Sequence, residues 1–144
     1  MTARRSHAFA SLALLLALGP TVACGDAEPA FTVPMTLGGV EVGADVLNQG
    51  AKIYAMRCAS CHGNDGSGNG PSGRALREPP RDFREGDFKH KSTPGDALPT
   101  DADLDEVIVK GRVEQGMPAW PGMSAEDRHA VVQYIKTFSP RWRE

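Results

Sequence analysis

The segment Cys58-Ala59-Ser60-Cys61-His62 constrains this chain more than any other feature of its sequence. Two thiols one helical turn apart can each add to a vinyl group of a porphyrin, and the imidazole that follows then faces the iron from the same side. Cys-x-x-Cys-His is accordingly the attachment signature of c-type haem. The segment therefore predicts one haem c, bound covalently through Cys58 and Cys61, with His62 as an axial ligand of the iron.

Two other uses of a Cys-x-x-Cys pair fit the surrounding sequence less well. A thioredoxin-like redox pair belongs to a βαβ context, whereas here a helical pattern precedes Cys58 and a glycine-rich loop follows His62. A structural zinc site needs four ligands, usually with a second close Cys/His pair. The later histidines, His90 and His129, are far apart in the sequence.

The loop Gly116-Met117-Pro118-Ala119-Trp120-Pro121 is the second informative feature. A methionine alone is most often a core residue, but a Met sulfur opposite a His is the axial pair of electron-carrying cytochromes c. With the haem-attachment segment upstream, Met117 is predicted to be the second axial ligand. Met123 is its nearest rival, and His90 or His129 also stays open as the sixth ligand.

The N-terminus has the layout of a secretory signal peptide. Arg4 and Arg5 precede an apolar run from Ala8 to Leu18, and small residues follow. The run is shorter than the roughly 20 residues that a membrane-spanning helix needs. Residues 1–23 are therefore expected to be a signal peptide. The mature protein should be exported, and either periplasmic or anchored to a membrane facing the periplasm.

Cys24 lies where the lipidated cysteine of a bacterial lipoprotein would lie, so the leader is expected to be of the lipoprotein type. Ordinary cleavage after Ala27 is the alternative. Residues 24–43 mix Pro, Gly, acidic and small apolar residues and are expected to form a flexible tether. Residues 44–144 would then form the haem domain. Without its leader the chain carries 14 Lys+Arg against 18 Asp+Glu, which argues against nucleic acid as a partner.

Three helices are expected from apolar residues at helical spacing. These residues are Val46, Gly50, Ile53 and Tyr54 in the first helix, Leu104, Val107, Ile108 and Gly111 in the second, and Val131, Tyr134, Ile135 and Phe138 in the third. Asp45 is the expected N-cap of the first helix. Thr100 with Asp103, and Ser124 with Asp127, form expected capping boxes for the other two.

The interval 63–100 separates the first two helices and contains seven glycines and five prolines. A structureless loop of this length normally counts against a compact domain. Three short helices alone would also leave a thin core. Both features are explained if the chain wraps around an apolar group such as a porphyrin, which supplies the missing apolar surface.

In combination these motifs resemble the class I cytochromes c over residues 45–138. The segment from Gly50 to Gly63 is similar to their N-terminal helix and haem motif, 111–118 to their distal loop, and 124–135 to their C-terminal helix. The resemblance implies an all-α cytochrome c fold, in which three or more short helices wrap around one covalently bound haem. It also implies that the first and last helices cross at Gly50, with Tyr134 packed nearby.

The same resemblance implies that a proline carbonyl accepts a hydrogen bond from the second nitrogen of His62. The possible acceptors are Pro71, Pro79 and Pro80. Trp120, Arg81 and Arg84 could meet the haem propionates, although both arginines lie in a mixed-charge run that is typical of a solvated surface.

The expected function is one-electron transfer in a respiratory or related chain, and not an enzymatic reaction. Redox proteins are the expected partners, a membrane-bound oxidoreductase among them, and a lipid on Cys24 would keep the domain near such a partner. Two alternatives stay open. The domain could feed electrons to an enzyme core encoded elsewhere, or it could sense a gas that displaces Met117.

Overall fold

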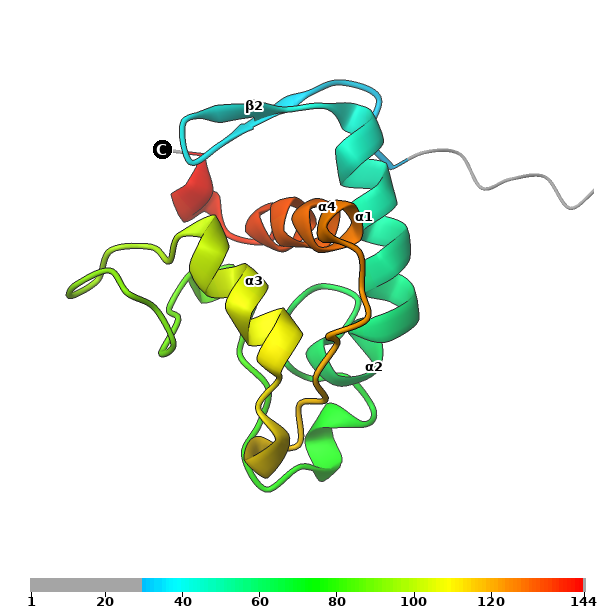
Figure 1. Cartoon of the computed structure of the whole chain (residues 1–144), viewed down its shortest axis with the longest axis vertical. Coiled ribbons are helices and arrows are strands. Elements are labelled where there is room, and N and C mark those ends of the chain that lie inside the picture. Colours follow the sequence, from blue (N-terminus) through cyan, green and yellow to red (C-terminus); the bar gives the residue numbers. More distant parts are fainter. Residues whose placement is uncertain (1–29, 144) are drawn as a thin grey trace, which may run out of the picture.

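The computed structural model describes residues 30–143, and its architecture is mainly helical (Figure 1). The α-helices are α1 Ala44–Arg57, α2 Ala59–His62, α3 Asp101–Lys110 and α4 Ala125–Lys136. Four short 3₁₀ turns are η1 Gly73–Ala75, η2 Phe83–Glu85, η3 Val113–Gln115 and η4 Pro140–Trp142. The strands β1 Met35–Leu37 and β2 Val40–Val42 form one antiparallel hairpin. The expected helical fold is thus confirmed, with a small sheet that was not expected.

Helices α1 and α4 cross at Gly50, as the resemblance to class I cytochromes c implied. A Cβ atom on Gly50 would meet the carbonyl group of Ala130 and would lie 2.7 Å from the Cβ of Tyr134. Only a glycine therefore allows the two backbones to approach this closely. Around the crossing, Leu47, Tyr54 and Val131 are at most 2% exposed. The helix pair forms the centre of the core.

Capping explains where the later helices begin. The Thr100 side chain accepts from the Asp103 N–H at 3.1 Å, and the Asp103 carboxylate accepts from the Thr100 N–H at 2.8 Å, which confirms the capping box of α3. Ser124 accepts from the Asp127 N–H at 3.0 Å. The Asp127 carboxylate does not complete a second box, because it accepts instead from Gln49 Nε2 on α1, at 2.8 Å.

The N-cap predicted for α1 is wrong. Gly43 occupies that position without a side-chain hydrogen bond, and Asp45 lies within the first turn. The carboxylate of Asp45 there lies among unpaired N–H groups, where the helix dipole favours a negative charge.

The flexible tether predicted for residues 24–43 is also wrong for its described part. Residues 35–42 form the hairpin, and Leu37 is fully buried. Gly38 N donates to Trp142 O at 2.6 Å, so the hairpin is fastened to the C-terminal turn. Phe31 is fixed to α1, because its N–H and C=O both hydrogen-bond the Asn48 side chain. Figure 1 shows the hairpin above α4, with one end beside the C-terminal turn.

The long interval 63–100 is ordered by turns rather than by long helices. Phe83 and Phe88 lie in it, and each is 8% exposed. Their rings stack with centroids 5.9 Å apart, and Phe83 also packs against Phe138 beyond α4. Aromatic side chains thus connect this loop to the α1–α4 core.

Helices α3 and α4 are joined by charged side chains. Arg128 Nε donates to Asp105 Oδ1 at 2.6 Å, and Lys136, only 4% exposed, pairs with Asp101. No helix within residues 30–143 is long and apolar enough to cross a membrane. The predicted signal peptide and Cys24 lie outside the described residues.

Candidate haem site

The haem-attachment segment sits at the junction of two helices. Cys58 ends α1, with its N–H donating to Tyr54 O at 2.8 Å, and it also precedes α2. The Tyr54 hydroxyl donates to Gly63 O at 2.8 Å, which fixes both ends of the segment. Cys58 and Cys61 are free and half-buried. Two unpaired thiols and an imidazole are therefore presented within little more than one helical turn.

His62 is held in a defined orientation. Its Nδ1 lies 3.4 Å from the Arg81 carbonyl oxygen, and its ring stacks on Phe83 with centroids 4.5 Å apart and planes 14° from parallel. A carbonyl can only accept, so Nδ1 carries the proton and Nε2 keeps its lone pair. Burial lowers the pKa of His62, which favours the neutral ring. A neutral imidazole of this tautomer is the form that binds iron.

The acceptor opposite His62 is not one of the three prolines that the family resemblance implied. It is Arg81, which directly follows Pro79-Pro80. The Pro80 carbonyl packs against Gly68 instead, and Pro71 is exposed. A carbonyl that accepts from the His62 ring orients that ring and raises its basicity, so Arg81 takes the role that was expected of a proline.

Cys58 lacks the character of a redox-active thiol. Burial raises the pKa of Cys58 to about 11, whereas reactive cysteines of redox pairs have lowered pKa values. Within residues 30–143 no group of three His, Cys, Asp or Glu side chains is gathered as a metal site. The surroundings of the segment thus resemble neither a thioredoxin site nor a structural zinc site.

Met117 lies in a tightly bonded turn. Arg112 and Met117 form an isolated antiparallel bridge, in which Arg112 N donates to Met117 O at 2.9 Å and Met117 N donates to Arg112 O at 3.0 Å. Between them lies η3, and Gly116 follows it with φ +92°. Trp120 N donates to Ile108 O at 3.0 Å, which attaches the end of the loop to α3. Met117 is half-buried at a fixed place.

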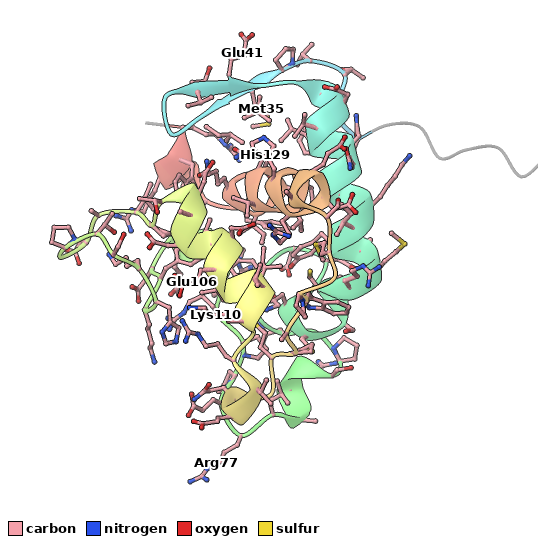
Figure 2. All side chains as sticks on the ribbon, in the orientation of Figure 1. Met35, Glu41, Arg77, Glu106, Lys110 and His129 are labelled. Atoms are coloured by element: carbon pink, nitrogen blue, oxygen red, sulfur yellow. The ribbon has the colours of Figure 1, made fainter. Side chains whose placement is uncertain are left out.

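The rival ligands differ in position. Met123 packs against the core. His129 is exposed on α4, and Figure 2 places it on the side facing the hairpin. His90 is also exposed, and it lies near the charge of Arg112, the residue opposite Met117.

Two cavities flank the Met117 turn. One, of about 430 Å³, lies between Leu76–Glu78 and Val113–Gly116. The other, of about 260 Å³, is bounded by Arg57 and by residues 119–123. Arg57 immediately precedes Cys58, and its guanidinium lies 4.9 Å from the Trp120 ring. The segment beginning at Arg57 and the Met117 loop therefore border the same space.

An unpartnered polar atom in this region fits a haem with its two carboxylates. Arg112 Nε is buried and has no hydrogen-bond partner among the described residues. The two arginines that were weighed against a solvated-surface role are already engaged: Arg81 pairs with Asp87 at 3.5 Å, and Arg84 pairs with Asp82 and Asp65. The Arg84 side chain is 49% exposed, as expected for the solvated surface that the mixed-charge run predicted.

Arg112 was missed by the sequence reasoning. In the sequence, the only feature that connects Arg112 with the site is its position five residues before Met117. Nothing in the sequence shows that the two residues pair. The residues at hand thus supply two thiols, a neutral imidazole, a thioether and a buried cationic donor.

A helical domain that carries this haem-attachment segment is a c-type cytochrome domain. The chain belongs to the family described as "Cytochrome C oxidase, cbb3-type, subunit III", whose model matches residues 45–135. Membership implies haem c and haem-based electron transfer.

A solved structure is similar as well. A chain of the Kuenenia stuttgartiensis reducing HAO-like protein complex is 37% identical, with a TM-score of 0.63. The match covers 67% of this chain and 44% of that chain, so the present chain spans less than half of its relative's length. Among curated proteins no relative matches.

Proposed function

We propose that this domain carries single electrons through one haem c, attached by thioethers to Cys58 and Cys61, with His62 and Met117 as the axial ligands. The observation that carries the proposal is the presentation of His62. Its Nδ1 is directed at the Arg81 carbonyl, which leaves Nε2 as the coordinating nitrogen beside two free thiols.

Haem c, when bound, supplies an iron that alternates between the ferrous and ferric states. Stacking on Phe83 and the Arg81 carbonyl hold the His62 imidazole in place. The bridge to Arg112 holds the backbone of Met117. Two ligands fixed in this way leave no free position for a substrate and change little between oxidation states, which suits a carrier better than an enzyme.

Covalent attachment is tested by denaturing the mature protein and extracting it with acidic organic solvent. We expect the haem to stay with the polypeptide. A Cys58→Ala/Cys61→Ala double variant should lose all covalent haem, and each single variant should keep one thioether. Release of the haem of the wild-type protein into the solvent would refute the proposal.

A second candidate is a subunit that passes electrons to an enzyme core on another polypeptide. Two observations favour it: the family is described as an oxidase subunit, and the similar solved chain belongs to a complex. Gentle solubilisation of native membranes followed by size fractionation distinguishes the two. A subunit elutes with larger polypeptides, whereas a free carrier elutes at the size of its own chain.

We further propose that the protein is exported and works in the periplasm, or at a membrane facing it, in a respiratory or related chain. The support is the leader-like pattern of residues 1–23. Redox proteins are the proposed partners. Cell fractionation checks the location, and haem-staining polypeptide confined to the cytoplasm would contradict it.

A further inference from the structure

Arg112 combines two features whose side-chain consequence the proposed function does not include. Its Nε is buried without a partner among the described residues, and it stands directly opposite Met117 in an antiparallel bridge. Residues directly opposed in an antiparallel pair place their side chains on the same face. The Arg112 side chain therefore extends on the same side of the turn as that of Met117.

Titratable side chains of two other segments lie within electrostatic range of Arg112. His90, from the 81–90 segment, is one of them; partial burial and the charges of Arg112, Arg81 and Lys89 lower the pKa of His90. From α3, Glu106 and Lys110 lie nearby. Figure 2 shows these two on the surface of α3.

Two carboxylates of the surrounding segments are already engaged by other cations. Asp87 pairs with Arg81, and Glu106 pairs with Lys110. Neither hydrogen-bonds Arg112 Nε. A buried donor without a partner is unfavourable, so the site lacks one anionic acceptor.

We propose that Arg112 binds a propionate carboxylate of the haem through Nε and a terminal nitrogen, and so sets the orientation of the haem ring beside Met117. A guanidinium offers two parallel donors to a carboxylate, and lysine cannot reproduce this geometry. Arg112 is a positioning residue: it touches the edge of the haem and not the iron. The inference rests on the proposed function.

Its positive charge also affects the redox equilibrium. A cation near the iron favours the ferrous state over the more positive ferric state. Neutralising Arg112 removes that cation and leaves the propionate charge uncompensated. Both effects stabilise ferric haem, so the reduction potential falls.

The test compares the reduction potentials of Arg112→Gln, Arg112→Lys and Lys110→Gln in the haem-loaded protein at one pH and ionic strength. Lys110→Gln is the matched control, because it removes the same charge from a side chain that is 68% exposed two residues away. We expect Arg112→Gln to lower the potential several times more than Lys110→Gln. Arg112→Lys should give an intermediate drop. A drop in Arg112→Gln no larger than that of the control overturns the inference.

A second measurement applies if Arg112→Gln does not assemble. Redox-difference infrared spectra of the wild type and Arg112→Lys, with haem labelled at its carboxylate carbons, should show a shifted propionate band in the variant. An unshifted band refutes the contact. Failure of the proposed function and failure of this inference give different results. Haem that can be extracted refutes the proposed function. Covalent haem whose reduction potential and propionate band do not depend on Arg112 refutes only this inference.

Discussion

Replacing Gly50 with alanine tests the packing of α1 against α4. The added methyl group would lie 2.7 Å from both the carbonyl carbon of Ala130 and the Cβ of Tyr134. Two of its three nearest atoms belong to the Ala130 carbonyl group, and this backbone cannot rotate away as a long side chain could. The two helices must therefore separate at the centre of the core.

The magnitude follows from two opposing effects. Alanine inside a helix is more favourable than glycine by about 1 kcal/mol. Overpacking of a filled core costs roughly 1–3 kcal/mol, and a clash with backbone belongs at the upper end of that range. The expected result is a net loss of about 1–2 kcal/mol in the free energy of unfolding. For a domain of this size each kcal/mol lowers Tm by roughly 4–8 °C.

The assay is guanidinium unfolding of the haem-loaded protein, followed by far-ultraviolet circular dichroism. Ala55→Gly on the exposed side of α1 is the control, since it reports helix propensity without the crossing. It should cost about 1 kcal/mol. If Gly50→Ala instead stabilises the domain by the amount that Ala55→Gly destabilises it, propensity alone governs the site and the close approach is unimportant.

Three further predictions concern the cap, the distal ligand and the N-terminus. Thr100→Ala should lower the free energy of unfolding by about 1 kcal/mol, and Thr100→Ser by much less, because only the alanine removes the hydroxyl that accepts from the Asp103 N–H; equal losses would argue against the cap. Met117→His should abolish the weak long-wavelength absorption of a sulfur–iron bond in the ferric protein and lower the reduction potential, since imidazole stabilises ferric iron better than a thioether does; a band that survives points to Met123. Cys24→Ser should move the cytochrome from the membrane to the soluble fraction with its haem spectrum unchanged, whereas a mature N-terminus that begins after Ala27 and carries no lipid would contradict the anchor.

Local patterns in the sequence predicted much of this fold. The Cys58–His62 segment and the Thr100 capping box each involve residues within five positions of one another, so their geometry follows from helix spacing alone. The contact at Gly50 was predicted from family resemblance, not from local spacing. Ligation by His62 and Met117 stays a prediction.

The hairpin was missed because its strands are only three residues long. Gly38-Gly39 between short apolar stretches is a recognised signal of a two-residue hairpin turn, and both glycines do adopt positive φ, +62° and +78°. The pattern was too short to stand out from an irregular segment. The hairpin is stabilised by the burial of Leu37 in the core and by the hydrogen bond from Gly38 N to the Trp142 carbonyl, more than 100 residues away.

The carbonyl opposite His62 and the pairing of Arg112 with Met117 could not be read from sequence for a related reason. Pro80 and Arg81 are adjacent in the sequence. The path of the folded chain decides which of their two carbonyl oxygens faces His62 and which packs against Gly68. Backbone acceptors carry no side-chain signature, so only the folded chain identifies them.

The attachment of Phe31 to α1 changes how far this cytochrome could travel from a lipid on Cys24. If all residues up to Gly43 were free, the domain could reach roughly 70 Å from the bilayer at 3.3–3.6 Å per residue. Because Asn48 holds Phe31, the connection ends there and spans at most about 25 Å in any conformation. If Cys24 carries a lipid, a domain on so short a connection would exchange electrons with partners at the membrane and would not shuttle over long distances.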